Sequence, residues 1–368
     1  MTRLEILHTE SSCGWGGQEL RVLDESEGFL RQGHGITIAA PPESRIIVEA
    51  RKRSVPVAAL PIARRSVAGL LALRSYLMLR PVDIVNTHSS TDSWLAAIAT
   101  RTLKMAPQIV RTRHVSAPIP DNWPSRWLYR GAAAHVVTTG VALRSQVMRE
   151  AGLDGSKVTS VPTGLDLQRF CPGGRNLARE LLGINKDKFV VGVVATLRSW
   201  KGHRYLVEAF AANANEASIL LIVGDGPGAE NLHRQVADLG IAEKVLMPGN
   251  QADVVPWLRA MDIFALPSYA NEGVPQAIMQ AQACGIPVIS TAVGSIGEIV
   301  DDGNTGLLVI PQDTSSLGAA MVRLRDDPGL RGRLASSALI QARERYSAQA
   351  MLVRMSEVFR GILDEDAV

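Results

Sequence analysis

The sequence contains few cysteines and few aromatic residues, and both shortages exclude classes of protein. Its three cysteines, Cys13, Cys171 and Cys284, lie far apart in 368 residues, which excludes a disulfide framework and any Cys-x-x-Cys metal or redox site. Aromatic residues make up 5%, and none alternate with arginine clusters as the stacking residues of nucleic-acid-binding proteins do. We therefore predict a protein of a reducing cytoplasm with no nucleic-acid partner.

The sequence also lacks a long apolar run. Its N-terminus has no stretch of the length that a signal peptide needs, and the longest uncharged segment, 273–297, is interrupted by Pro275, Pro287 and several glycines. We expect no membrane-spanning helix. With 46% apolar and 20% charged residues, the composition is typical of a folded chain of two or three domains.

Short apolar segments alternate with amphipathic ones, and this pattern occurs twice. The predicted strands are 4–8, 36–39, 84–87, 109–113, 136–138, 190–195, 219–223, 263–266 and 288–291. Helical patterns lie between them, among others at 18–32, 67–79, 94–102, 204–211, 229–239 and 275–283. This alternation is typical of parallel sheets with crossover helices. Prolines and glycines interrupt the chain near 162–175, so we predict two doubly wound α/β domains that bind ligands beyond the carboxyl ends of their strands.

The charge is uneven along the chain. Residues 1–164 contain 20 Lys+Arg and 13 Asp+Glu, a balance of +7, whereas residues 165–368 contain 19 and 23, a balance of −4. The basic excess surrounds the Leu-rich segment 67–79, at Arg45, Arg51, Lys52, Arg53, Arg64, Arg65, Arg74 and Arg80. A basic side chain near an anionic leaflet adds about 1 kcal/mol of attraction, so one interpretation is a face that meets anionic lipid or a lipid-linked substrate. The alternative is an ordinary solvated surface.

Candidate residues of the first half lie in loops that follow strands. Gly16 and Gly17 come directly before a predicted helix, where backbone N–H groups favour an anion, although a tight turn is the alternative. His88 and His114 each follow a strand. We interpret His8 and the remaining histidines as structural. Because no cluster of His, Cys, Asp or Glu has metal-ligand spacing, we predict no metal site.

The loops of the second half are more specific. Arg198 and Lys201 follow a buried strand, which suits a diphosphate that is neutralised without a metal. The segment 224–229 matches Gly-x-Gly-x-x-Ala and fits either a dinucleotide loop or a simple turn with Pro227 beginning the next helix.

The segment 267–288 is the most specific of all. A strand ends at Pro267, a loop presents Glu272, and we expect a helix to start near Val274 with its free N–H groups facing a ligand. Gln280 lies about two turns along that helix, where we expect it to face the same ligand.

Taken in order, these motifs resemble the retaining GT-B glycosyltransferases of family GT4 over almost the whole chain. The motifs that carry the resemblance are Gly16-Gly17-Gln18-Glu19, 161–166 with Arg169-Phe170, Lys201-Gly202, 224–227, Pro267-Ser268, Glu272-Gly273 with Pro275, 285–288, and 297–300 with Asp302-Gly303 and Gly306.

The resemblance implies two Rossmann-like domains that face each other across a cleft. The N-terminal, acceptor-binding domain is residues 1–164 with a C-terminal helix at about 348–368, and the donor-binding domain is residues 165–347. A nucleotide-diphosphate sugar is the implied donor substrate, with no cofactor and no required metal. Lys201 is implied to contact the donor diphosphate, with Arg198 as a further phosphate ligand and the amides of Gly16 and Gly17 nearby.

The resemblance also implies roles around the sugar. Glu272 and the amides of Gly273 and Val274 hold the donor sugar and its phosphate, and His114 faces the transferred sugar. His88 is a candidate on the acceptor side.

Two positions depart from the family pattern. Thr196 stands where the family often has Arg, and Gln280 replaces a Glu that usually binds the ribose hydroxyls. An amide can still donate to one hydroxyl and accept from another, without the strength of a charged bond. We expect Glu272→Ala and Lys201→Ala to abolish transfer while thermal unfolding stays nearly unchanged.

Three functional hypotheses follow. The first is a retaining hexosyltransferase that extends a lipopolysaccharide core, an O-antigen or an exopolysaccharide at the cytoplasmic face of the inner membrane. The second, motivated by Thr196 and Gln280, is a non-catalytic nucleotide-sugar-binding scaffold of a glycan assembly complex. The third is a nicotinamide-dependent oxidoreductase that uses 224–229 as its cofactor loop.

Overall fold

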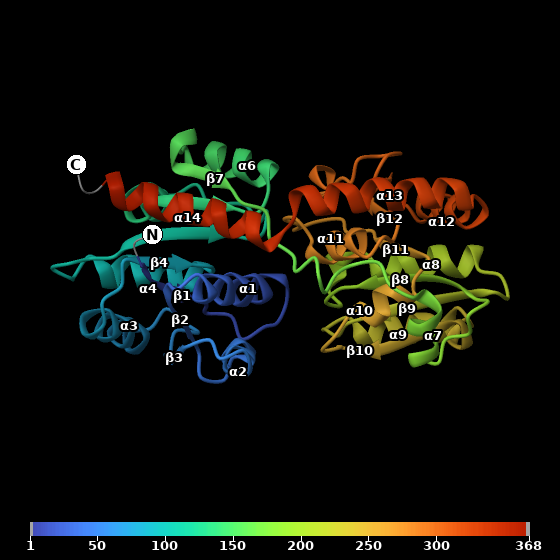
Figure 1. The fold of residues 1–368 in the computed structure, drawn as a ribbon, viewed down its shortest axis with the longest axis horizontal. Coiled ribbons are helices and arrows are strands. Elements are labelled where there is room, and N and C mark those ends of the chain that lie inside the picture. The colour runs from blue at the N-terminus through green and yellow to red at the C-terminus, as the bar shows by residue number, and fades with distance from the viewer. Residues whose placement is uncertain (1–2, 366–368) are drawn as a thin grey trace. The chain divides into compact units, whose positions relative to one another are not determined.

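The strands of the described residues form two parallel sheets, each with helices packed on its faces (Figure 1). The computed structural model describes residues 3–365; residues 1–2 and the end of the predicted C-terminal helix, 366–368, lie outside the described residues. The chain divides into a first unit, Met1–Gly164 with Ala348–Val368, and a second unit, Leu165–Ser347. Two doubly wound α/β folds are therefore confirmed.

The sheet of the first unit has the strand order β3-β2-β1-β4-β5-β6-β7. Its strands are β1 (Glu5–Thr9), β2 (Gly35–Ala40), β3 (Val57–Ala59), β4 (Ile84–Thr87), β5 (Gln108–Arg113), β6 (His135–Thr138) and β7 (Val158–Ser160). Its helices are α1 (Gly17–Arg31), α2 (Arg45–Lys52), α3 (Val67–Leu79), α4 (Ser90–Thr100), α5 (Trp123–Trp127), α6 (Val141–Ala151) and α14 (Ala348–Glu365).

Alternation along the strands gives this sheet two apolar faces. Ile6 and Ile84 pack with α14, whereas Leu7 and Val85 pack with α3 and α4. Phe359 of α14 is fully buried in this core. The last helix of the chain, red in Figure 1, thus belongs to the first unit.

The sheet of the second unit has the strand order β10-β9-β8-β11-β12-β13. Its strands are β8 (Phe189–Val194), β9 (Ser218–Val223), β10 (Val245–Gly249), β11 (Ile263–Leu266), β12 (Val288–Thr291) and β13 (Gly306–Val309). Its helices are α7 (Arg175–Leu181), α8 (His203–Asn213), α9 (Ala229–Asp238), α10 (Val255–Ala260), α11 (Gln276–Ala283), α12 (Thr314–Asp326) and α13 (Pro328–Arg345). The central strands β8, β9, β11 and β12 are almost fully buried, as their apolar runs indicate.

The start of α11 corrects one expectation. The sequence predicts a helix from near Val274, but α11 begins at Gln276. Pro275 precedes it with φ −68° and ψ 116°, an extended conformation, and a residue before proline is itself disfavoured in the helical region. Gly273 and Val274 therefore belong to the loop, together with Glu272.

Candidate functional site

A buried ion pair joins two of the predicted donor-binding residues in the second unit. Lys201 ends the short helix η3 (Ser199–Lys201) that follows β8, and Glu272 lies in the loop between β11 and α11. Lys201 Nζ donates to both carboxylate oxygens of Glu272, at 2.7 and 2.9 Å, and Ser268 Oγ donates to Oε1 at 2.5 Å. The Glu272 side chain is only 5% exposed, so Lys201 neutralises a carboxylate that is out of contact with most solvent.

Two glycines let the loops around this pair approach closely. Gly202 has φ 76°, and a Cβ atom there would lie 2.0 Å from Pro267 O. Gly294, in the loop after β12, has φ 62°, and its Cβ atom would lie 2.1 Å from Glu272 O. Side chains are disfavoured at both positions by conformation and by space. The pair is thus held by loops that follow β8, β11 and β12.

The other residues of the second unit that are predicted to bind the donor supply backbone N–H groups, an amide and a guanidinium. Gly273 and Val274 are buried, and their N–H groups donate no hydrogen bond to any residue that the structure describes. Gln280 is 7% exposed within α11. Arg198 is exposed and lies over Trp200, with its guanidinium carbon 5.1 Å from the ring centroid. One ammonium group and two unbonded N–H groups at the ends of neighbouring strands suit phosphate oxygens.

The glycines of 224–229 have a packing role. Gly224 has φ 142°, and a Cβ atom there would lie 2.0 Å from Ala195 O; at Gly226 it would lie 2.9 Å from Leu197 N. Packing within the turn thus accounts for both glycines. The expectation that Pro227 begins a helix is wrong by two residues, because α9 begins at Ala229.

Three histidines form a chain in the first unit, at the carboxyl ends of the adjacent strands β1, β4 and β5. His8 Nδ1 lies 2.9 Å from His88 Nε2, and His88 Nδ1 lies 3.0 Å from His114 Nε2. Burial lowers the pKa of His8 to about 3 and the pKa values of His88 and His114 well below the usual value, so all three are neutral at pH 7. His8, which the sequence analysis interprets as structural, thus lies within hydrogen-bond distance of one of the two predicted histidines.

The chain of neutral rings constrains where the protons lie. A neutral imidazole has one N–H, so each of the two contacts needs one donor and one acceptor. If His8 donates from Nδ1, then His88 and His114 must also carry Nδ1–H; if His88 donates to His8, all three carry Nε2–H. Because His114 Nε2 is bonded to His88 in both arrangements, the position of the proton on His8 determines whether His114 Nδ1 donates a hydrogen bond to a ligand or accepts one.

Two buried acids lie beside this chain and were not among the predicted site residues. Glu10 follows β1 and accepts hydrogen bonds from Ser89 Oγ, at 2.6 Å, and from the Gln18 side chain. Burial, with Asp92 and Glu19 nearby, raises the pKa of Glu10 to about 8. Burial also raises the pKa of Asp92 to about 6. Glu10 accordingly holds a proton at neutral pH, at the edge of the sheet where the histidines lie.

A cavity of about 520 Å³ opens beside these groups within the first unit. His88 and His114 line it, and so does Gln18, which follows Gly16 and Gly17 at the start of α1. The remaining lining residues include Arg65, Ser89, Trp94, Arg111, Arg113, Ile119, Leu128 and Tyr129. Its volume is in the usual range for a small-ligand site.

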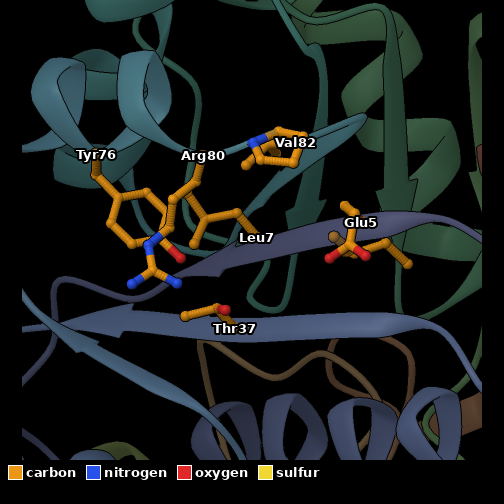
Figure 2. Close-up of a pocket in the computed structure, with 8 residues that line it drawn as sticks. Glu5, Leu7, Thr37, Tyr76, Arg80 and Val82 are labelled. Carbon is orange, nitrogen blue, oxygen red and sulfur yellow. The ribbon is translucent and has the colours of Figure 1, made fainter.

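A smaller cavity of about 180 Å³ lies elsewhere in the first unit (Figure 2). Glu5 and Leu7 of β1, Thr37 of β2, and Tyr76 and Arg80 at the end of α3 surround it. It contains none of the predicted site residues. Because Glu5 begins β1, this cavity lies toward the amino ends of the strands, whereas ligands of parallel sheets bind beyond the carboxyl ends.

Residues 3–365 contain neither a candidate metal-binding cluster nor a candidate membrane-spanning helix. No group of three or more His, Cys, Asp or Glu side chains there is arranged to hold a metal ion. No helix in the same part of the chain has the length and apolar character needed to cross a bilayer.

Comparison with known proteins identifies the family. The family "Glycosyl transferases group 1" matches residues 175–340, and "Glycosyltransferase Family 4" matches residues 15–169. The chain is 31% identical over 279 residues to an Escherichia coli UDP-Gal:alpha-D-GlcNAc-diphosphoundecaprenol alpha-1,3-galactosyltransferase, a match that covers 72% of this chain and 71% of that one. This chain belongs to glycosyltransferase family 4.

Two further comparisons extend this result. The glycosyltransferase is 33% identical over 285 residues to a D-inositol 3-phosphate glycosyltransferase of Stackebrandtia nassauensis, covering 71% of this chain and 64% of that one. Its fold matches the crystal structure of Anabaena Alr3699/HepE in complex with UDP, with a TM-score of 0.85 over 97% of this chain and 100% of that one, at 22% identity. The GT-B fold expected from the sequence is therefore confirmed.

Proposed function

We propose that this family 4 glycosyltransferase is a retaining enzyme that moves a hexose from a UDP-sugar, without a metal, to a lipid-diphosphate-linked glycan acceptor in cell-surface polysaccharide biosynthesis. The observation that carries the donor part is the Lys201–Glu272 pair beside the unbonded N–H groups of Gly273 and Val274. The UDP bound to HepE and the donor and acceptor named for the E. coli relative support the choice of substrates.

Each group has a task in this proposal. In a retaining transfer through front-face departure, negative charge develops on the leaving diphosphate, and Lys201 with the N–H groups of Gly273 and Val274 stabilises it. Glu272 holds Lys201 and accepts from the donor sugar. His114 accepts from or donates to that sugar, according to the proton arrangement of the histidine chain. Gln280 binds the ribose hydroxyls, and His88 contacts the acceptor.

A thermal-shift screen, confirmed by calorimetry, tests the donor class. We expect UDP and one UDP-sugar to stabilise the protein equally with and without EDTA, and GDP, ADP and CMP to do so less. UDP at about 100 times its Kd adds about 2.7 kcal/mol to the free energy of unfolding, because it binds only the folded state. A stabilisation that EDTA removes would contradict metal-independent binding.

A hydrolysis and transfer assay separates the transferase from a non-catalytic scaffold, which Thr196 and Gln280 favour. With the stabilising UDP-sugar, we expect slow donor hydrolysis that Glu272→Gln abolishes. Donor binding without hydrolysis, and without transfer to any lipid extract, would favour the scaffold.

We also propose that α3 contacts the membrane surface, where a lipid-linked acceptor is found. Four apolar side chains of this helix are exposed: Val67 by 73%, Leu71 by 56%, Met78 by 53% and Leu79 by 81%. Val67, Leu71 and Met78 recur at helical spacing on one face. Arg64, Arg65 and Arg80 are exposed at the two ends of the helix. Exposed apolar side chains and arginines both contribute to binding at the surface of an anionic bilayer.

Co-sedimentation with vesicles tests this surface. We expect binding to phosphatidylglycerol-containing vesicles that weakens as salt is added, little binding to pure phosphatidylcholine, and at least a tenfold loss for the variant Leu71→Glu/Met78→Glu. The matched control is Leu177→Glu/Leu181→Glu on α7, where the two leucines are 61% and 71% exposed. Equal losses in both variants would contradict a specific role for α3.

A further inference from the structure

The 520 Å³ cavity of the first unit is lined by arginines and by no acidic residue. Arg65, Arg111 and Arg113 line the cavity, and no Asp or Glu does. Arg111 is 7% exposed, and its guanidinium carbon lies 4.3 Å from the centroid of the Tyr129 ring. Arg113 Nη1 donates to Tyr129 Oη at 2.7 Å, and its Nη2 donates to Ala117 O. Two guanidinium groups therefore share one tyrosine.

Neither arginine is fully satisfied by the protein. Arg111 Nη1 and Arg113 Nε are buried and have no hydrogen-bond partner. Among the described residues, no carboxylate oxygen lies within 4.0 Å of either guanidinium. Asp92 is the acid that acts on Arg111 from a greater distance, and its own oxygens accept from Thr9 Oγ1 and from the N–H groups of His88 and Ser89.

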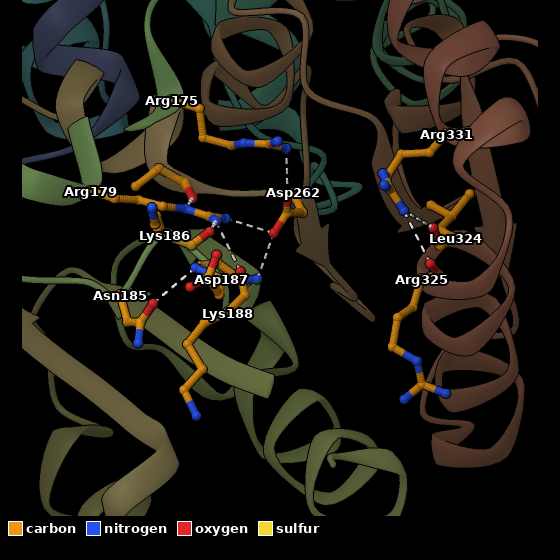
Figure 3. A network of polar contacts seen from close by, with 12 residues as sticks. Arg175, Arg179, Asn185, Lys186, Asp187, Lys188, Asp262, Leu324, Arg325 and Arg331 are labelled. Atoms are coloured by element: carbon orange, nitrogen blue, oxygen red, sulfur yellow. Dashed lines mark hydrogen bonds and ion pairs between the residues drawn. The ribbon is translucent and has the colours of Figure 1, made fainter. Parts of the chain in front are cut away.

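Arg21 and Arg179, which are buried like Arg111, differ in this respect. Arg179 lies 2.6 Å from Asp262 (Figure 3), and Arg21 lies 3.5 Å from Glu25. A buried charge without a partner is costly, and a fold that supplies acids to Arg179 and Arg21 could have supplied one here. The missing acid at Arg111 and Arg113 therefore indicates that the negative charge comes from outside the protein.

We propose that Arg111 and Arg113 bind an oxyanion group of the acceptor, a phosphate or a carboxylate, while Trp94, Ile119 and Tyr129 contact the sugar ring or chain that carries it. Planar guanidinium groups match the paired oxygens of both anions. Because His88 and His114 line the same cavity, the anion lies on the acceptor molecule near the hydroxyl that is glycosylated. This inference rests on the proposed transferase function and adds the residues of the first unit that recognise a negative charge on the acceptor.

Calorimetry with soluble probes tests the site. The probes are N-acetylglucosamine 1-phosphate, glucuronic acid and neutral N-acetylglucosamine, and the protein is the full chain with Lys201→Met/Glu272→Gln, which removes the charged pair of the second unit. We expect at least one anionic probe to bind at least tenfold more tightly than the neutral sugar, and Arg111→Met and Arg113→Met to abolish that preference. Comparison of N-acetylglucosamine 1-phosphate with glucuronic acid shows whether the site prefers a phosphate or a carboxylate.

The controls separate binding from folding and from the proposed function. Arg149→Met, at an exposed arginine of α6, should leave probe binding unchanged. Arg111→Met should unfold at a temperature no lower than that of the parent, because it removes a buried charge that has no acid partner. Equal binding of all three probes, unchanged binding in Arg111→Met, or a large loss of thermal stability in that variant would each overturn the proposal. UDP binding to the wild-type chain is measured separately. If UDP does not bind, the proposed transferase function is contradicted, whereas the proposed anion site is not.

Discussion

Asp262→Ala should lower the free energy of unfolding of the second unit by about 3–5 kcal/mol, because it leaves a buried arginine without its acid. Arg175 and Arg179 both point toward Asp262 (Figure 3). Arg179 Nη2 donates to Asp262 Oδ2 at 2.6 Å, and the N–H group of Val190 donates to the same oxygen at 2.8 Å. The Arg179 and Asp262 side chains are 2% and 6% exposed, so water cannot replace the lost carboxylate.

Urea denaturation followed by circular dichroism measures this loss, and two further variants test its cause. Arg175 is 51% exposed, so Arg175→Ala should cost at most about 1 kcal/mol. Arg179→Met/Asp262→Leu removes both charges and should regain part of the stability lost in Asp262→Ala, although the N–H group of Val190 and the carbonyls that Arg179 bonds lose their partners. A loss under 1 kcal/mol in Asp262→Ala would contradict the argument, as would a double variant less stable than the single one.

The strands that the sequence predicts lie inside the two sheets, and the strands that it does not predict lie at their edges. The nine predicted strands are the inner strands of the two sheets, where burial on both faces selects uninterrupted apolar runs. The pattern predicts none of the four edge strands, β3, β7, β10 and β13. β3 and β10 contain no fully buried residue, so no apolar run identifies them in the sequence. The fold class could thus be predicted from inner strands alone, but the width of each sheet could not.

The candidate site shows a similar limit. Lys201 and Glu272 were predicted from loop position and family resemblance, but nothing in the sequence indicates that they bond to each other. His8, Arg111 and Arg113 lie inside or near strands, where alternation alone suggests packing rather than chemistry. The signal that could have found His8 is the strand order, because β1, β4 and β5 are neighbours and their carboxyl ends bring His8, His88 and His114 together.

Lys201→Met should reduce transfer by about 10²–10³-fold, since it removes a positive charge from the place where the leaving diphosphate gains negative charge. The structure revises the expectation that such a variant unfolds like the wild type. Glu272 would remain buried with Ser268 as its side-chain donor, and leaving a buried acceptor without its partner costs at least about 1–3 kcal/mol, with the larger costs for charged groups. Steady-state kinetics and thermal denaturation of the same variant measure the two effects.

A double-mutant cycle separates the structural part of the pair from the catalytic part. Lys201→Met/Glu272→Gln removes both charges and should regain stability relative to Lys201→Met, because the neutral amide is less costly to bury than the unpaired carboxylate. Activity should not recover, since the double variant still lacks the ammonium group that the diphosphate requires. The matched control is Lys244→Met, which breaks the exposed pair with Glu216. It should change the free energy of unfolding and the activation free energy of transfer each by at most about 1 kcal/mol. Recovery of transfer in the double variant would mean that Lys201 serves only to neutralise Glu272, and that the leaving diphosphate does not require its ammonium group.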